Sequence, residues 1–77
     1  MKKPDIDKIR TTPLGTERIR KKLGLEVDDV VTWCKQAVLN ANSSSIVQEG
    51  KNWYIYGDWY VLTINKGSHT IITAHKR

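Results

Sequence analysis

The sequence predicts an α+β domain, with two N-terminal helices packed on an antiparallel sheet of three or four strands. Two observations carry this prediction. Apolar residues recur with a helical period in the first half of the chain, and the period changes to that of a strand after Ser45. Short glycine-containing turns then separate the later segments, as in an antiparallel meander. With 77 residues, the chain is expected to form one domain with a thin core and room for one site.

We expect the first helix at residues 13–23. Thr12 can cap its N-terminus because a threonine hydroxyl accepts a hydrogen bond from an otherwise unpaired amide, and Pro13 is tolerated at the first helical position. Gly24 follows the helix, where a left-handed C-terminal cap favours glycine. Before this helix, residues 1–10 are expected to form either a loose arm or a short helical turn.

The second helix is expected at residues 27–40, where the helical pattern is strongest. Its apolar stripe consists of Val27, Val30, Val31, Cys34 and Val38. Asp28 and Asp29 would then lie in the first turn, where carboxylates complement the positive end of the helix dipole. A polar loop over residues 40–45 ends the helix and leads into the sheet.

Four strands are expected at residues 45–48, 52–57, 59–65 and 69–75. If residues 66–68 form a three-residue turn, Asn65 pairs with His69. Leu62 then pairs with Ile72. This register gives one mainly apolar face for the helices to cover, made of Tyr60, Leu62, Ile64, Thr70, Ile72 and Ala74. The opposite face would carry Trp59, Val61, Thr63, Asn65, His69, Ile71, Thr73 and His75.

The two histidines, His69 and His75, would point to the same side of the last strand, about 20 Å apart. Histidines so distant, with one cysteine and no close acidic set, argue against a metal site, and no cofactor is expected. Cys34 fits the apolar stripe of the second helix, so we expect it to be structural. His75 is a candidate acid or base, because an imidazole exchanges protons near neutral pH.

The chain carries 13 Lys and Arg against eight Asp and Glu, a formal net charge of +5. This imbalance favours an anionic partner, and nucleic acid first. Arg18 and Lys22 are one turn apart on one side of the first helix, where we expect phosphate contacts. Aromatic residues cluster in the strands, at Trp53, Tyr54, Tyr56, Trp59 and Tyr60. Some of these rings belong to the core, and others point outward, where they can stack on unpaired bases.

The charged start of the chain is not followed by an apolar segment, and no stretch approaches the roughly 20 apolar residues of a membrane span. A single cysteine excludes an internal disulfide. We therefore expect a soluble cytoplasmic protein with no signal peptide and no membrane partner. No glycine-rich phosphate loop, paired carboxylates or nucleophile elbow is present, so nucleotide, glycoside and serine hydrolysis have no support.

Five blocks of sequence fall in order between residues 11 and 76. They are Thr11-Thr12-Pro13-Leu14-Gly15, Arg18-Ile19, Asp28-Asp29-Val30-Val31-Thr32-Trp33-Cys34-Lys35, Gly50-Lys51-Asn52-Trp53-Tyr54 and Ser68-His69-Thr70-Ile71-Ile72-Thr73-Ala74-His75-Lys76. Through these blocks the chain resembles a family of small bacterial proteins, the domain-of-unknown-function family 3781. That resemblance implies no established activity.

A looser resemblance lies in the order of the elements. Two basic helices, a Gly-containing hairpin and a last strand with a Thr and a terminal His are similar to the fold of RelE-type toxins and colicin-type ribonucleases. This resemblance implies metal-independent cleavage of tRNA or mRNA, in which a ribose 2′-oxygen attacks the adjacent phosphate. His75 would be the acid or base, and Thr73 would orient the phosphate. Lys35 or Arg18 would neutralise developing charge, and a cognate antitoxin or immunity protein would restrain the enzyme.

The residues expected to bind RNA are Arg18, Lys22, Asn52, Tyr54, Asn65, Ser68 and Lys76. Two other functions stay open. The first is a non-catalytic nucleic-acid-binding or regulatory module. The second is a phage-related protein-binding module. Degradation of RNA in EDTA, abolished by replacement of His75, would separate the ribonuclease from both alternatives.

Overall fold

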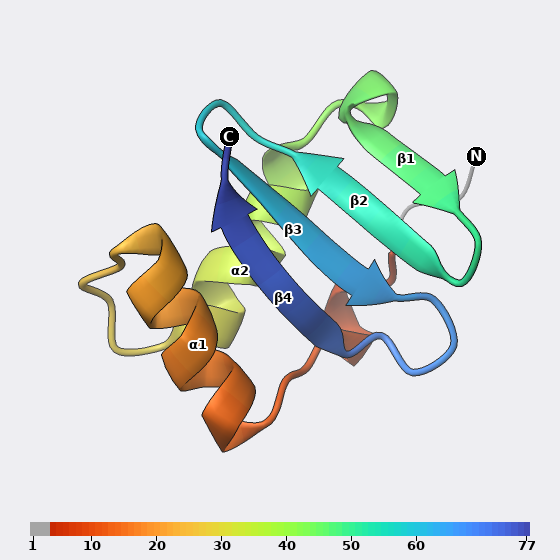
Figure 1. Cartoon of the computed structure of the whole chain (residues 1–77). Helices are drawn as coiled ribbons and strands as arrows, with labels where there is room; N and C mark the ends of the chain where they lie inside the picture. The colour runs from red at the N-terminus through yellow and green to blue at the C-terminus, as the bar shows by residue number, and fades with distance from the viewer. Residues whose placement is uncertain (1–3) are drawn as a thin grey trace.

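The computed structural model describes residues 4–77. Within them lie two α-helices, two 3₁₀ turns and a four-stranded antiparallel sheet with the strand order β1-β2-β3-β4. The elements are η1 (Ile6–Lys8), α1 (Pro13–Leu23), α2 (Val30–Asn40), η2 (Ser43–Ser45), β1 (Ile46–Glu49), β2 (Asn52–Tyr56), β3 (Tyr60–Asn65) and β4 (Ile71–Lys76). Figure 1 shows α2 behind the sheet and α1 beside β4. The α+β prediction is confirmed, whereas the similarity to RelE-type toxins stays a prediction.

The first helix has the predicted bounds, because neighbouring residues fix both of its ends. The Thr12 hydroxyl accepts a hydrogen bond from the Gly15 amide at 2.9 Å. Gly24 ends the helix in the left-handed conformation, with φ 65°, which a residue without a Cβ adopts readily. Ile19 and Leu23 are buried, and α1 packs against β4. Its polar side is therefore left toward solvent.

The second helix begins at Val30, and the predicted start at Val27 is wrong. Asp29 caps this helix, because its carboxylate accepts hydrogen bonds from the Thr32 amide at 3.0 Å and from the Thr32 hydroxyl at 2.7 Å. Asp28 and Asp29 therefore precede the first turn instead of lying in it. Val27 still packs against the core from outside the helix, which explains why the apolar pattern extends further than the helix.

The N-terminal segment forms a short helical turn, one of the two predicted forms, and residues 1–3 lie outside the described residues. Ile9 follows the turn and is 3% exposed. Arg10 then pairs with the start of the last strand. Its amide donates to the His69 carbonyl at 3.1 Å, and the Ile71 amide donates to the Arg10 carbonyl at 2.8 Å.

The core lies between the sheet and the helices. Its buried side chains come from both α-helices and all four strands, and include Ile19, Val30, Cys34, Val38, Ile46, Ile55, Leu62, Ile64, Ile71 and Ala74. Burial raises the pKa of the Cys34 thiol to about 12, so the thiol stays neutral and unreactive near pH 7. No helix in the described part of the chain is long and apolar enough to cross a membrane.

The register of the final hairpin differs from the predicted one. Leu62 pairs with Ala74, and the predicted pairing with Ile72 is wrong. The register then shifts by one residue, so that Ile64 pairs with Ile71 and Ile72 is the extra residue of a bulge. Ile71 consequently faces the core at 1% exposure and Ile72 is 42% exposed, which reverses the predicted faces of these two residues.

Thr73 and His75 nevertheless lie on the face predicted for them. They pair with Thr63 and Val61, and these residues alternate along β3 with the core residues of that strand. A register error of two positions preserves which face a side chain occupies, whereas an error of one would have reversed it.

His69 does not share that face, so the prediction that the two histidines point to the same side is wrong. It precedes β4, which begins two residues later than predicted, and its backbone is left-handed, with φ 59°. Its ring packs edge-to-face on Trp53, with 5.1 Å between the ring centres. Trp53 is a core residue with 4% exposure, so the His69 ring lies on the side of the sheet that the helices cover.

Candidate nucleic-acid interface

One face of the sheet is open within residues 4–77, and it is turned toward the viewer in Figure 1. Strand pairing arranges its outward residues in three rows, Val47-Tyr54-Thr63-Thr73, Tyr56-Val61-His75 and Asn52-Asn65. Neighbouring strands lie about 4.8 Å apart, so residues adjacent in a row are close enough to contact one another. Five of the predicted site residues share this open face, namely Asn52, Tyr54, Asn65, Thr73 and His75.

The row that includes His75 lies near the C-terminal end of β4. Val61 occupies its centre and is 5% exposed, so Tyr56 and His75 flank a filled position. The guanidinium carbon of Arg77 lies 5.7 Å from the centre of the Tyr56 ring, and its Nη1 donates a hydrogen bond to the Gly57 carbonyl at 2.7 Å. A cation is thus held over an aromatic ring at the same end of the face as the exposed imidazole.

The neighbouring row supplies hydroxyl groups. Tyr54, Thr63 and Thr73 follow one another across β2, β3 and β4, and Thr63 is 6% exposed. Thr73 precedes His75 by two residues on the same strand, so their side chains point the same way, about 7 Å apart. The open face therefore brings together an imidazole, a hydroxyl and an aromatic ring from the predicted site.

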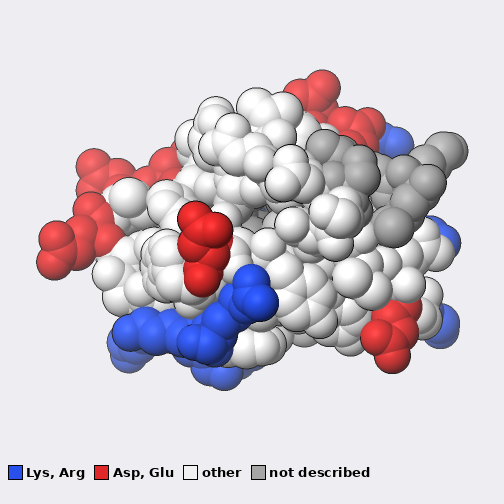
Figure 2. Space-filling view, turned by 90° about the horizontal axis from the view of Figure 1, so that it is seen from above, with Lys and Arg blue, Asp and Glu red and all other residues white. Residues whose placement is uncertain are grey.

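Cations border the open face along α1. Arg18, Lys21 and Lys22 are exposed on this helix, and Lys76 is exposed at the end of β4. Figure 1 shows α1 and β4 side by side and running in the same direction, so their C-terminal ends lie at one end of the molecule. Seen from that end, Lys and Arg side chains gather along one margin of the surface, beside a broad area with few charges (Figure 2).

Lys35, which was predicted to neutralise charge at the site, does not lie near His75. It is half-buried on α2, behind the sheet, whereas His75 is on the open face. The charge of Lys35 acts on Asp29 instead. The pKa of that carboxyl is lowered mainly by hydrogen bonds from Thr32, and Lys35 adds to this effect.

Asn65 and Ser68, both predicted to contact RNA, shape the turn between β3 and β4. The Oδ1 atom of Asn65 accepts hydrogen bonds from the amides of Gly67 and Ser68, both at 2.9 Å. This arrangement is an Asx turn, in which a side chain replaces a backbone acceptor. The Asn65 oxygen is thereby already engaged within the protein.

Three features were not found from the sequence. Arg77 lies over Tyr56 only because the strand register brings the chain end to β2. Trp33, Trp59 and Tyr60 form an edge-to-face cluster with ring centres 5.0 to 6.0 Å apart, and burial together with a nearby carboxylate raises the pKa of Tyr60. A hollow also lies between the N-terminal turn and the β3–β4 turn. Of the residues involved, only Tyr56 had a signal in the sequence, because alternation along β2 predicts that its ring points to the open face.

These features define a small basic α+β protein with one open, aromatic face on its sheet. The chain belongs to the family described as Protein of unknown function (DUF3781), whose model matches residues 4–75. Comparison with curated proteins and with solved structures gave no match. No group of three or more His, Cys, Asp or Glu side chains that could hold a metal ion occurs in the described part of the chain.

Proposed function

We propose that the open face binds unpaired RNA and that the protein is a metal-independent ribonuclease of the toxin type, acting on tRNA or mRNA. The observation that carries this proposal is the placement of His75, Thr73 and Tyr54 on one face beside the cations of α1. A cytoplasmic location fits the single buried cysteine. A cognate antitoxin or immunity protein would restrain the activity.

RNA recognition on this face divides between bases and phosphates. Unstacked bases lie on Tyr54 and Tyr56, because every base offers a ring face to an aromatic side chain. Phosphates along the strand approach Arg18, Lys22 and the cations at the end of β4, where neutralisation releases counterions. The face thereby holds one phosphate beside the imidazole.

Cleavage needs two proton transfers. The ribose 2′-oxygen forms a bond to phosphorus and loses its proton, while the bond to the 5′-oxygen breaks and that oxygen gains a proton. His75 performs one transfer, and water supplies the other. The Thr73 hydroxyl donates a hydrogen bond to a non-bridging oxygen, and Arg77 replaces Lys35 in neutralising the developing charge. The products are a cyclic phosphate and a 5′-hydroxyl end.

The test is RNA degradation in EDTA by the purified protein, by His75→Ala and by His69→Asn. His75→Ala should lose about 10²- to 10⁴-fold in cleavage rate, because a positioned acid or base contributes that much. His69→Asn removes the other imidazole but keeps a residue that tolerates the left-handed backbone, so it should cleave RNA without a 5′-phosphate at the parent rate. Equal rates for all three proteins, each folded by circular dichroism, would exclude His75 from the reaction.

A non-catalytic RNA-binding module is the second candidate, and one observation favours it. Within residues 4–77 the His75 imidazole makes no hydrogen bond, whereas a neighbouring group commonly sets the orientation of a histidine that transfers protons. In this case the open face binds RNA as described, and neither the parent protein nor His75→Ala cleaves it. The EDTA experiment therefore separates the two candidates.

A further inference from the structure

A separate hollow lies at the end of the sheet where the β3–β4 turn meets the N-terminal segment. Its volume is about 420 Å³, within the range of small-molecule sites. The lining residues are Asp7, Lys8, Ile9, Arg10, Gly67, Ser68 and His69. Because the His69 ring packs on Trp53, this hollow belongs to the helix-covered side of the sheet, and His75 belongs to the other side.

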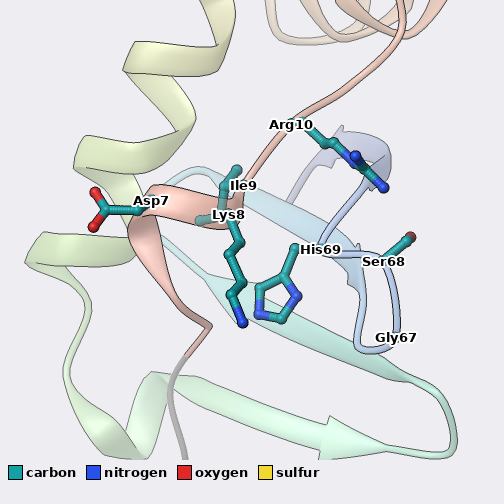
Figure 3. Close-up of a pocket in the computed structure, with 7 residues that line it drawn as sticks. All are labelled: Asp7, Lys8, Ile9, Arg10, Gly67, Ser68 and His69. Atoms are coloured by element: carbon teal, nitrogen blue, oxygen red, sulfur yellow. The ribbon is translucent and has the colours of Figure 1, made fainter.

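Two positively charged side chains, Lys8 and Arg10, line this hollow. Figure 3 shows the side chains of Lys8 and His69 directed toward each other, whereas the Arg10 guanidinium extends away from them toward Ser68 and the Asp7 carboxylate points away. In the described part of the chain the one ion pair joins residues of α1, so neither Lys8 nor Arg10 has a carboxylate partner. Two uncompensated cations and an imidazole in one concavity are complementary to an anion.

Backbone pairing, not a loose loop, holds these groups in place. The amide of Arg10 donates to the His69 carbonyl at 3.1 Å, and the His69 amide donates to the Asn65 carbonyl at 2.8 Å. His69 keeps its left-handed backbone although it is not glycine, a conformation that concentrates at functional sites. Its ring covers Trp53, whose buried Nε1–H has no hydrogen-bond partner within residues 4–77.

We propose that this hollow binds a phosphate monoester, carried either by a free nucleotide or by the 5′ end of an RNA strand. A phosphate dianion matches the summed charge of Lys8 and Arg10. Its oxygens accept from the Lys8 ammonium and the His69 imidazole, which lie side by side, and Arg10 adds positive charge at the other rim of the hollow. A carboxylate carries one charge and would leave one of the two cations uncompensated. The site does not depend on RNA cleavage at His75, because it lies on the other side of the sheet.

The experiment is an NMR titration of the full chain with inorganic phosphate, and then with uridine 5′-monophosphate and with uridine. The indole Nε1–H signal of Trp53 reports on the hollow, and the indole signals of Trp33 and Trp59 in the same spectrum serve as internal controls. We expect phosphate and the nucleotide to shift the Trp53 signal and the amides of Arg10 and His69, whereas uridine should not.

Two variants with the same change in net charge complete the design. Lys8→Met should weaken phosphate binding about tenfold, as expected for loss of one charge-assisted contact. Lys51→Met, an exposed position in the β1–β2 turn, should bind phosphate like the parent. Equal weakening in both variants, or shifts spread over α1 without any at Trp53, would overturn the proposal.

Oligonucleotides with and without a 5′-phosphate then identify the source of the phosphate. Tighter binding of the 5′-phosphorylated strand, with a shift at Trp53, supports the site and assigns it to RNA ends. A shift at Trp53 with the mononucleotide alone supports the site and assigns it to a free nucleotide. Cleavage activity is not part of this readout, so failure of the ribonuclease proposal leaves this test unaffected.

Discussion

The two faces of the sheet use the same strands for different purposes. On the helix-covered face, Ile55 and Leu62 are fully buried and pack in the core. On the open face, their chain neighbours Tyr54 and Thr63 lie in a row that extends to Thr73 on β4. Because alternate side chains point to opposite faces, one strand can supply both a core and a recognition surface. Substitutions at adjacent positions should therefore have separable effects on stability and on RNA binding.

The largest effect on stability is expected from Ile55→Ala. Removing a fully buried isoleucine side chain should lower the free energy of unfolding by about 2 to 5 kcal/mol, which is a large part of the stability of a small domain. The adjacent change Tyr54→Ala, on the open face, should cost clearly less. Urea unfolding followed by circular dichroism measures both. If Ile55→Ala does not fold, Ile55→Val should still lose about 0.5 to 1.5 kcal/mol.

Equal losses of stability in Ile55→Ala and Tyr54→Ala would contradict the difference between the two faces. They would mean that Tyr54 is held as tightly as the core, so that its ring is not available to a base. Folded Ile55→Val should bind RNA normally, because the Ile55 side chain is fully buried and lies outside the RNA surface.

The next effect concerns the aromatic rings of the open face. Tyr54→Ala should weaken binding of single-stranded RNA by about 5- to 150-fold, since base stacking on an aromatic ring contributes about 1 to 3 kcal/mol. Tyr54→Phe keeps the ring and should bind nearly as well as the parent. Fluorescence anisotropy with a labelled oligonucleotide measures this difference. If Phe and Ala weaken binding equally, the tyrosine contributes its hydroxyl and not its ring.

The bounds of α1 could be predicted because they are set by local chemistry. Thr12, Pro13 and Gly24 act on amides and dihedral angles within a few residues of themselves, and the sequence displays them next to the helix. The start of α2 was missed for a related reason. Asp29 was assigned to the helix dipole, although an aspartate followed at three positions by Thr32 is also a capping arrangement.

The register of the final hairpin could not be read from the hairpin alone. The bulge at Ile72 accompanies pairing of Arg10 with the start of β4, a contact between distant parts of the chain. The faces of Thr73 and His75 were predictable, because alternation survives a shift of two positions. The position of Lys35 relative to His75 was not predictable. The helical pattern places Lys35 on α2, but it does not tell on which side of the sheet α2 packs.

A smaller effect is expected from the cations that border the open face. Each phosphate of a single strand that a cation neutralises contributes about 0.7 to the magnitude of the slope of log affinity against log salt concentration. Arg18→Ala combined with Lys22→Ala should therefore reduce that slope by up to about 1.4. Lys35→Ala, on the opposite side of the sheet, is the matched control and should leave the slope unchanged. A salt dependence identical in all three proteins would leave α1 outside the interface.

The smallest effect should arise at Asp29, which caps a helix behind the sheet and lies away from the RNA surface. Hydrogen bonds from Thr32 lower the pKa of this carboxyl in the folded protein. The charged form thus stabilises the fold above the unfolded pKa of about 3.9, and this contribution is lost as pH falls through the lower folded pKa. Asp29→Asn keeps an acceptor for the Thr32 amide but cannot titrate.

Thermal unfolding between pH 2 and pH 6 tests this expectation. The parent protein should be more stable than Asp29→Asn near pH 6, and the difference should shrink as the pH falls below about 4. Asp28→Asn changes the same charge at the neighbouring exposed position and should show a weaker pH dependence of that difference. Parallel profiles of the parent and Asp29→Asn would contradict the cap assignment. RNA affinity at neutral pH should be the same in both variants, because neither carboxylate lies on the open face.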